Sequence, residues 1–209
     1  GTTFALNNTF ASGGTTAVTN SGLLTKNATG AVTSTGAFST TGAASLAANV
    51  TTTNADLTIG GALTLAEAAT VTLSTGAGTA GNILLSGAVD GTGGGVAETL
   101  TLQAGTGSAT FGGALGTGDA LKLNAVTLTN AAATGFNNTV NLAGALTQTN
   151  AATGATTFGN TVNVGSADLK GTTFALNNTF ASGGTTAVTN SGLLTKNATG
   201  AVTSTGAFS

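Results

Sequence analysis

The stretch GTTFALNNTFASGGTTAVTNSGLLTKNATGAVTSTGAFS spans residues 171–209, and residues 1–39 have the same sequence without a single change. Position 1 recurs at position 171, an offset far longer than the roughly 20–50 residues of most structural repeats, so a shorter period should lie inside it. We expect residues 1–170 to form one full repeat and residues 171–209 to start the next identical repeat, with no linker between them.

A five-residue pattern supplies the shorter period: an apolar residue, then Asn, Gly or Ala two positions later, then a second apolar residue after two more positions. Its members, of which those at Ala28 and Glu67 match least well, are Leu6–Phe10, Ala28–Val32, Leu46–Val50, Glu67–Val71, Leu85–Val89, Phe111–Leu115, Phe136–Val140, Phe158–Val162 and Leu176–Phe180. The steps between members are unequal, and eight steps lead from Leu6 to its copy Leu176. We therefore predict about eight coils in each repeat, each of about 21 residues, at the short end of the usual range of repeat lengths.

Apolar and polar residues alternate between the members of this pattern, as in Thr70–Ser74 and Thr99–Gln103. Such alternation is typical of strands, whose successive side chains point to opposite faces. The 34 glycines disfavour helices, because glycine inside a helix costs about 1 kcal/mol relative to alanine. The sequence therefore predicts an all-β fold, a parallel β-solenoid in which each coil buries the apolar side of the next. A flat stack of strands is the alternative fold, and the unequal steps argue against it.

The central position of the pattern holds Asn or Gly in most members. We interpret it as a tight corner between two strands, where these residues adopt the left-handed backbone conformation. The asparagines of this set are also candidates for amide ladders that run from coil to coil. These candidates are Asn8, Asn138, Asn160 and Asn178. The alternative is that the central residues are simply small residues in a crowded interior.

Composition argues against most chemical functions. The chain contains no His and no Cys, so a Ser–His–Asp triad and the usual zinc sites are excluded. Four basic residues and a net charge of −2 do not supply the basic face that nucleic-acid binding needs. No apolar run approaches the roughly 18 residues that would span a membrane, so we expect no membrane insertion.

We expect no cofactor, no metal and no enzymatic activity. Gly76–Gly81 matches the dinucleotide pattern GxGxxG, but a strand-like run follows it where a helix is required. The six acidic residues are scattered at uneven steps rather than placed once per coil, which disfavours a calcium array. Glu98 and Asp119 are about one coil apart, with Lys122 close in sequence, so paired-carboxylate catalysis is the enzymatic alternative. Solvated loop charges are the simpler interpretation.

Threonine is the commonest residue, with 47 of 209 positions. Flat arrays of Thr-x-Thr on a regular solenoid resemble the ice-binding faces of some antifreeze proteins, and the same polar face suits a glycan. The unequal coil lengths predict a staggered array instead of a lattice. Pairs of this kind include Thr70/Thr72, Thr99/Thr101, Thr127/Thr129 and Thr147/Thr149.

The sequence resembles giant bacterial surface proteins of the filamentous-haemagglutinin-like and autotransporter type. The resemblance rests on its composition and on short segments such as Thr110–Leu115 (TFGGAL) and Thr157–Val162 (TFGNTV). This resemblance implies a right-handed β-helix, secretion and an extracellular or cell-surface location. It also implies a structural role in a filament or adhesin stalk, with copies of the same chain as partners through head-to-tail stacking and lateral bundling. An ice-binding or glycan-binding solenoid that uses its Thr-rich outer face is the alternative function.

Overall fold

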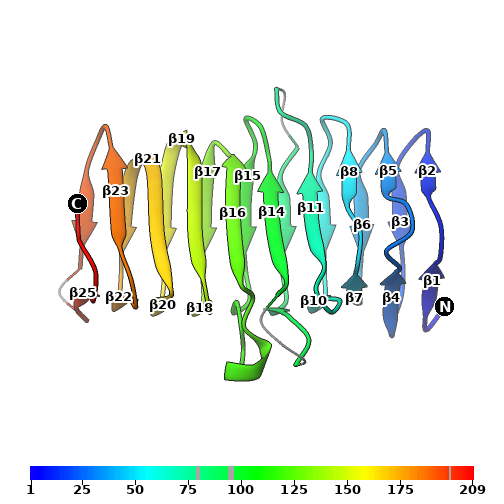
Figure 1. Ribbon diagram of the computed structural model, residues 1–209. Helices are drawn as coiled ribbons and strands as arrows, with labels where there is room; N and C mark the ends of the chain where they lie inside the picture. The colour runs from blue at the N-terminus through cyan, green and yellow to red at the C-terminus, as the bar shows by residue number, and fades with distance from the viewer. Residues whose placement is uncertain (79–80, 94–96, 198) are drawn as a thin grey trace.

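The computed structural model describes residues 1–78, 81–93, 97–197 and 199–209. The chain winds into a rod of stacked coils, with its two termini at opposite ends (Figure 1). Every strand pair of the described residues is parallel, and the only helical element among them is the short 3-10 helix η1 (Asp119–Leu121). The predicted all-β parallel β-solenoid is confirmed.

Each complete coil contributes strands to three faces of the rod. The first face contains β1 (Phe4–Leu6), β4 (Leu23–Lys26), β7 (Ala43–Leu46), β10 (Leu63–Leu65), β13 (Val89–Asp90), β18 (Val140–Asn141), β20 (Val162–Val164), β22 (Phe180–Ser182) and β25 (Val202–Ser204). Leu115 joins β13 to β18 through single bridges.

The second and third faces belong to one large sheet that bends around an edge of the rod. The second face contains β2 (Phe10–Ser12), β5 (Val32–Ser34), β8 (Val50–Thr52), β11 (Thr70–Ser74), β14 (Thr99–Gln103), β16 (Ala125–Asn130) and β23 (Thr186–Asn190). The third face contains β3 (Thr16–Val18), β6 (Phe38–Thr40), β9 (Leu57–Ile59), β12 (Ile83–Leu85), β15 (Ser108–Phe111), β17 (Ala133–Phe136) and β24 (Leu194–Lys196). Two long strands, β19 (Ala145–Phe158) and β21 (Ser166–Leu176), pass from the second face to the third.

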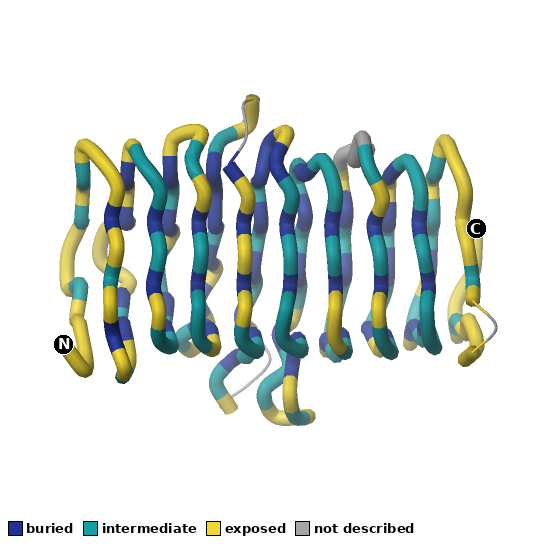
Figure 2. Tube along the Cα trace, turned by 180° about the vertical axis from the view of Figure 1, so that it is seen from behind, coloured by how far each residue is buried: buried dark blue, intermediate teal, exposed yellow. Residues whose placement is uncertain are grey.

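The core consists of apolar side chains inside the rod. Buried positions recur from coil to coil along the Cα trace (Figure 2). Along the third face, the rings of Phe111, Phe136 and Phe158 stack with centroids 4.8 and 4.9 Å apart. Phe180, the first residue of β22 on the first face, meets Phe158 edge-on at 5.7 Å. Because no coil covers its own apolar side, burial of this core depends on neighbouring coils.

Coils of unequal length keep their strands in register. Neighbouring strands of the first face pair Leu63 with Ala44 in a short coil and with Val89 in a long one. The extra residues of the longer coils lie in the bends, including residues 75–78, 81–82 and 116–124, where no strand is formed. The register therefore depends on the strands and tolerates bends of different size.

The two identical segments occupy different faces of the rod. Phe4 lies on the first face, opposite Leu24, whereas its copy Phe174 lies on the third face, between Thr156 and Leu194. After β1 the chain passes the first face seven more times before residue 174, at β4, β7, β10, β13, Leu115, β18 and β20. The offset between the two copies therefore corresponds to seven and two-thirds coils, close to the eight expected.

The pattern of the sequence explains the missing third of a coil. Its early members, such as Leu46–Val50, join the first face to the second. Its later members, beginning with Leu85–Val89, join the third face to the first. The step between the two groups, from Glu67 to Leu85, thus crosses only two faces. A pattern of apolar and small residues marks corners but does not distinguish one corner from another.

Candidate functional site: a polar groove beside the protruding loop

The loop of residues 116–124 projects from one edge of the rod (Figure 1). The chain leaves the first face at Leu115, turns at Gly116 in the left-handed conformation (φ +64°), and forms η1 before it returns to the second face at β16. A Cβ atom at Gly116 would lie 2.2 Å from the backbone oxygen of Asn141. Glycine is therefore required both by the backbone conformation and by the approach of the next coil.

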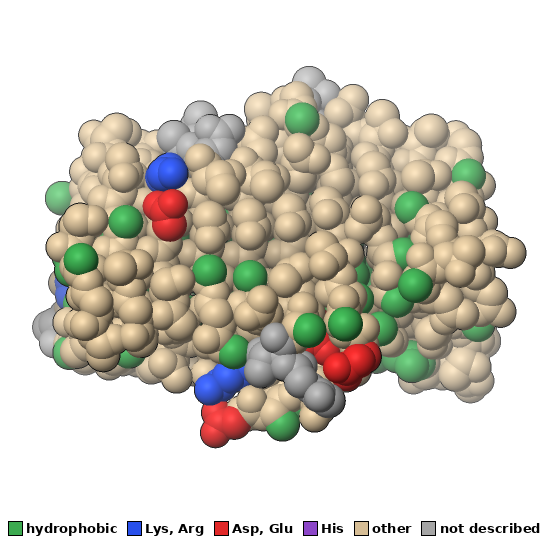
Figure 3. Space-filling model, viewed as in Figure 1, with side chains coloured by type: hydrophobic (Ala, Val, Ile, Leu, Met, Phe, Trp, Pro, Cys, Tyr) green, Lys and Arg blue, Asp and Glu red, His purple; other side chains and the backbone are tan. Residues whose placement is uncertain are grey.

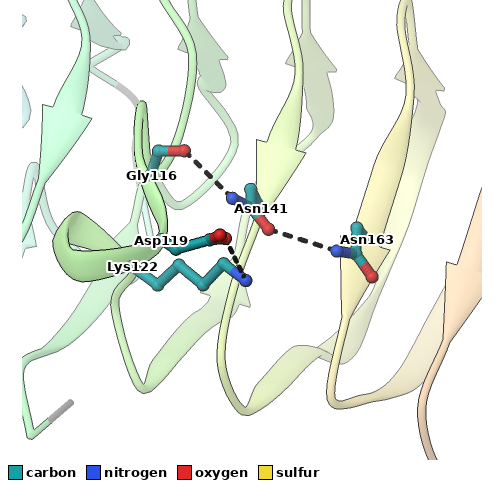
Figure 4. A network of polar contacts seen from close by, with 5 residues as sticks. All are labelled: Gly116, Asp119, Lys122, Asn141 and Asn163. Atoms are coloured by element: carbon teal, nitrogen blue, oxygen red, sulfur yellow. Dashed lines mark hydrogen bonds and ion pairs between the residues drawn. The ribbon is translucent and has the colours of Figure 1, made fainter.

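A polar groove of about 380 Å³ lies beside this loop, along the first face. Asn141 of β18 and Asn163 of β20 form its floor, and Asp119 of η1 forms one side (Figure 4). Asn163 donates an amide hydrogen bond to Asn141 Oδ1 at 3.3 Å, and Asn141 donates to the Gly116 carbonyl at 3.4 Å. The remaining lining residues are Ala114, Gly116, Thr117, Thr139, Val140 and Thr161.

The single carboxylate of the groove is held by an ion pair. Lys122 Nζ lies 2.9 Å from Asp119 Oδ1, and this hydrogen bond and the lysine charge lower the pKa of Asp119. The Asp119 side chain is nevertheless 93% exposed. The groove thus offers an ionised carboxylate, two amides and several hydroxyl groups, which together can exchange hydrogen bonds with a hydroxyl-rich ligand.

The two carboxylates that the sequence suggested as a pair lie in different surroundings. Glu98 is fully buried, and its Oε1 accepts hydrogen bonds from the Thr92 hydroxyl (2.7 Å) and the Thr92 amide (3.3 Å). Asp119 points into solvent, and no hydrogen bond or ion pair described for either residue joins them. Burial by itself would raise the pKa of Glu98, but the hydrogen bonds from Thr92 and nearby backbone amides lower it below its usual value.

A second acidic residue reaches the same threonine. The Thr92 hydroxyl lies 3.0 Å from Glu67 Oε2, while Oε2 of Glu98 has no hydrogen-bond partner among the described residues. In the described part of the chain no three acidic side chains are close enough together to hold a metal ion. The contact of Glu67 with Thr92 was not predicted, because the two residues belong to neighbouring coils 25 positions apart.

The corner residues lie between strands as predicted, but the left-handed conformation is wrong for every central Asn and Gly except Gly30. The pattern does mark corners: β1 ends at Leu6 and β2 begins at Phe10, on either side of Asn8. Of the central residues, only Gly30 has a positive φ (+74°). Asn8, Asn138, Asn160 and Asn178 are not among the residues with positive φ.

The side chains of three of these asparagines replace the expected left-handed turn. Oδ1 of Asn138, of Asn160 and of Asn178 accepts a hydrogen bond from the amide of the next residue, at 2.8–2.9 Å. This local bond stabilises the bend without a positive φ. One ladder contact is present in this set, from Asn178 Nδ2 to Asn160 Oδ1 at 3.4 Å.

Further amide ladders occur at asparagines that were not among the predicted candidates. Asn27 donates to Asn7 Oδ1 at 2.8 Å, in addition to the contact between Asn163 and Asn141 in the groove. The available signal for the groove was the dipeptide Val-Asn, which ends the corner pattern at Val140–Asn141 and recurs at Val162–Asn163.

Threonines of the second face form one aligned column, contrary to the predicted stagger. Thr72, Thr101, Thr127 and Thr147 are paired in register on four consecutive coils. All four are partly exposed, and the next position of the column is Asp168. The prediction failed because the length differences between coils are absorbed in the bends and leave the strand register unchanged.

Charged side chains are few on the face shown in Figure 3 and gather mainly along its lower edge. Within the described residues, no helix has the length and apolar character needed to cross a membrane. In the glycine-rich segment 76–81, Thr79 and Ala80 lie outside the described residues, and the segment leads into strand β12, as predicted.

These features define a parallel β-solenoid with a polar groove, a fold compatible with surface proteins of the repeat type. Comparison with known proteins adds no relative: no family model, no curated protein and no solved structure matches the chain.

Proposed function

We propose that this protein is a structural, non-enzymatic segment of an extracellular filament or adhesin stalk on a bacterial cell surface, built from tandem copies of the unit formed by residues 1–170. The observation that carries the proposal is strand β21, which runs from Ser166 to Leu176. It crosses the boundary between Lys170 and Gly171 without a break, so the start of the second copy continues the same solenoid. Tandem copies joined in this way lengthen a rod.

The two identical segments also show what covers each end of a unit. Val32 is 1% exposed because β8 pairs with its strand, whereas its copy Val202 is 36% exposed. At the other end, Phe4 is 40% exposed, whereas its copy Phe174 is 1% exposed beneath β19. Each apolar edge is buried where another coil follows or precedes it, which supports head-to-tail stacking of units.

The arrangement suits a mechanical role. Hydrogen bonds between parallel strands run from coil to coil along the rod, so stretching or bending the rod has to break them. A surface with few charges also permits lateral association of rods.

The proposal can be tested by imaging chains of one, two and three units. Each added unit should lengthen the rod by about 37 Å, because coils stack about 4.8 Å apart. A Val162→Lys substitution, which puts a charge into the core, should interrupt the rods, whereas Asn163→Lys on the exposed neighbour should leave them intact. Compact particles that do not lengthen with copy number would contradict the proposal. The cell-surface location is tested by antibody labelling of intact source cells.

A second candidate function is binding of ice or of a glycan by the Thr-rich outer face. The aligned column Thr72, Thr101, Thr127 and Thr147 favours it, because hydroxyl groups repeat along one face at the spacing of the coils. Either thermal hysteresis or glycan-array binding should be present in the native chain and lost in Thr101→Lys/Thr127→Lys. Thr58→Lys on the third face is the matched control. A native chain that is inactive in both assays would eliminate this candidate.

A further inference from the structure

We infer that successive units of the tandem array are turned by one third of a coil, so that the rod presents each surface feature on three sides. The inference rests on the proposed tandem array for its biological meaning. The rotation itself is read from strand pairing within this chain. The rotation states on which face each groove, loop and column of side chains lies in every successive unit of the rod.

Three pairs of identical strands establish the rotation. β1 lies on the first face, and its copy at the end of β21 lies on the third. β2 lies on the second face, and its copy β22 lies on the first. β3 lies on the third face, and its copy β23 lies on the second.

In all three pairs, the second copy of the strand lies one face away from the first copy, in the same direction around the rod. The later strands agree with them: β4 is on the first face and its copy β24 on the third, and β5 is on the second face and its copy β25 on the first. The register does not drift within a copy, since Phe4 pairs with Leu24 as Phe174 pairs with Leu194. A rigid segment with unchanged internal pairing has therefore been moved by one face.

The rotation arises because the length of the sequence repeat is not a whole number of coils. One unit contains seven and two-thirds coils, so identical residues return to the same face only after three units. A feature of the second face in one unit lies on the first face in the next and on the third face in the one after. The axial spacing between equivalent features is about 37 Å.

This rotation decides what kind of contact the rod can make. The groove beside residues 116–124, whose amide, hydroxyl and carboxylate groups fit a hydroxyl-rich ligand, is offered in three directions. A stalk with this arrangement can be engaged from any side. The aligned threonines of one unit, by contrast, do not continue on the same face in the next unit, so a one-sided lattice stays about four coils long.

Disulfide cross-linking in the 209-residue chain tests the rotation directly, because the chain has no cysteine of its own. Outward residues that pair across neighbouring parallel strands are about 4.8 Å apart, within the Cα range of roughly 4.4–6.8 Å for a disulfide. Thr157→Cys/Ala175→Cys joins residues paired on the third face and should form a disulfide on mild oxidation. Asn163→Cys/Ala175→Cys joins residues on different faces and should not.

If one unit contained a whole number of coils, the two cysteine pairs would give the opposite result. Residue 175 would then lie on the first face, as its counterpart Ala5 does, in the column that contains Asn163. Asn163→Cys/Ala181→Cys, paired on the first face, is the positive control for oxidation. A disulfide between positions 163 and 175 in place of 157 and 175 would overturn the inference.

A second measurement extends the test to the array. In a chain of three units, gold attached through Asp119→Cys in each unit should mark three sides of the rod at successive spacings of about 37 Å. Marks on a single side would contradict the rotation. Failure of the three-unit chain to form a rod would contradict the proposed function instead, while the disulfide pattern decides the rotation independently.

Discussion

The segments 1–39 and 171–209 share one sequence but lie at opposite ends of the rod and on different faces. Their internal contacts are nevertheless reproduced. Asn27 donates an amide hydrogen bond to Asn7 at 2.8 Å, and the bond from Asn197 to Asn177 has the same length. Local geometry therefore follows from the sequence of two consecutive coils, wherever these coils lie along the rod.

Burial differs between the same two segments. Near the start of the segment the second copy is more buried, and near its end the first copy is more buried. Phe4 is 40% exposed and its copy Phe174 is 1% exposed. Phe38 is 1% exposed and its copy Phe208 is 52% exposed. Substitutions at matched positions can therefore separate what a residue contributes through its own conformation from what it contributes through the coils next to it.

The largest difference is expected for the phenylalanines. Phe174→Ala and Phe38→Ala each remove a buried ring and should lower the free energy of unfolding by about 3–5 kcal/mol. Phe4→Ala and Phe208→Ala make the same change at exposed copies and should cost less than about half as much. Urea unfolding of the four variants measures this. Equal losses at identical positions would show that neighbouring coils do not determine the contribution of a ring.

A smaller difference is expected for an asparagine that connects coils in only one copy. Asn20 is 4% exposed, donates to the carbonyls of Gly22 (2.8 Å) and Ala43 (3.1 Å), and accepts from the Gly42 amide (2.9 Å). Its copy Asn190 keeps the local bond, to Gly192 at 2.6 Å.

Asn20→Ala should therefore lower stability by about 1–3 kcal/mol, because buried backbone groups lose their partners. Asn190→Ala should change it by less than about 1 kcal/mol. Thermal unfolding of the two variants, followed by circular dichroism, gives the comparison. A larger effect at Asn190 than at Asn20 would contradict the coil-to-coil assignment.

The left-handed glycines should respond alike in both copies, because each has the same backbone conformation and the same preceding coil against it. Gly30 has φ +74° and Gly200 has φ +76°. An added Cβ would lie 2.2 Å from Thr9 Oγ1 in the first copy and 2.4 Å from the Thr179 amide nitrogen in the second. Each Gly→Ala substitution should cost at least about 1–2 kcal/mol from backbone conformation.

Gly13→Ala, where no atom lies within 4 Å of the added Cβ, is the matched control for these glycines and should be nearly neutral. Chemical unfolding of the three variants measures the costs. Tolerance at Gly30 together with loss at Gly200 would show that the corner is not a local property.

The smallest effect is a pH dependence at the buried lysine. Lys26 is 1% exposed and donates to the carbonyls of Asn27 (2.7 Å) and Thr29 (2.8 Å), and burial lowers its pKa. The folded state then releases the Lys26 proton at a lower pH than the unfolded chain does. Stability should rise with pH as it approaches about 10.4, the ordinary pKa of lysine.

Urea midpoints between about pH 8 and pH 10.5 test this expectation. Lys26→Met should remove the alkaline gain, whereas Lys196→Met, at the more exposed copy, should retain it because Lys26 is still present. A gain that persists in Lys26→Met would assign the pH dependence to another group.

Much of the fold was predictable from the sequence. Alternating runs such as Thr99–Gln103 indicated strands, and the spacing of the five-residue pattern indicated coils of nearly the observed length. The corner at Asn8 was located correctly, since an apolar residue ends one strand and another begins the next. Its left-handed conformation was mispredicted, as it was at Asn138, Asn160 and Asn178, whose side chains accept the following amide and stabilise the bend without a positive φ.

The candidate site was harder to predict. Asn141, Asn163 and Asp119 converge only because the loop after Leu115 folds back along the first face. The recurring dipeptide Val-Asn marks Asn141 and Asn163, but no motif connects Asp119 with them. The same limitation applied to Glu98, which the sequence paired with Asp119 and the structure buries beside Thr92. Contacts between coils depend on how many residues each bend contains, and a linear pattern does not report which face those residues reach.

Sequence alone determined the class of fold, the length of the repeat and the positions of the corners. The alternation of apolar and polar residues and the glycine content act over short stretches of chain. The identity of 1–39 with 171–209 is visible by direct comparison of the sequence with itself. Only the tertiary structure decided which face of the rod each segment occupies, how deeply each copy is buried and which residues line the groove. These depend on summed bend lengths and on neighbouring coils, and the sum over one unit stops one third of a revolution short of a whole number.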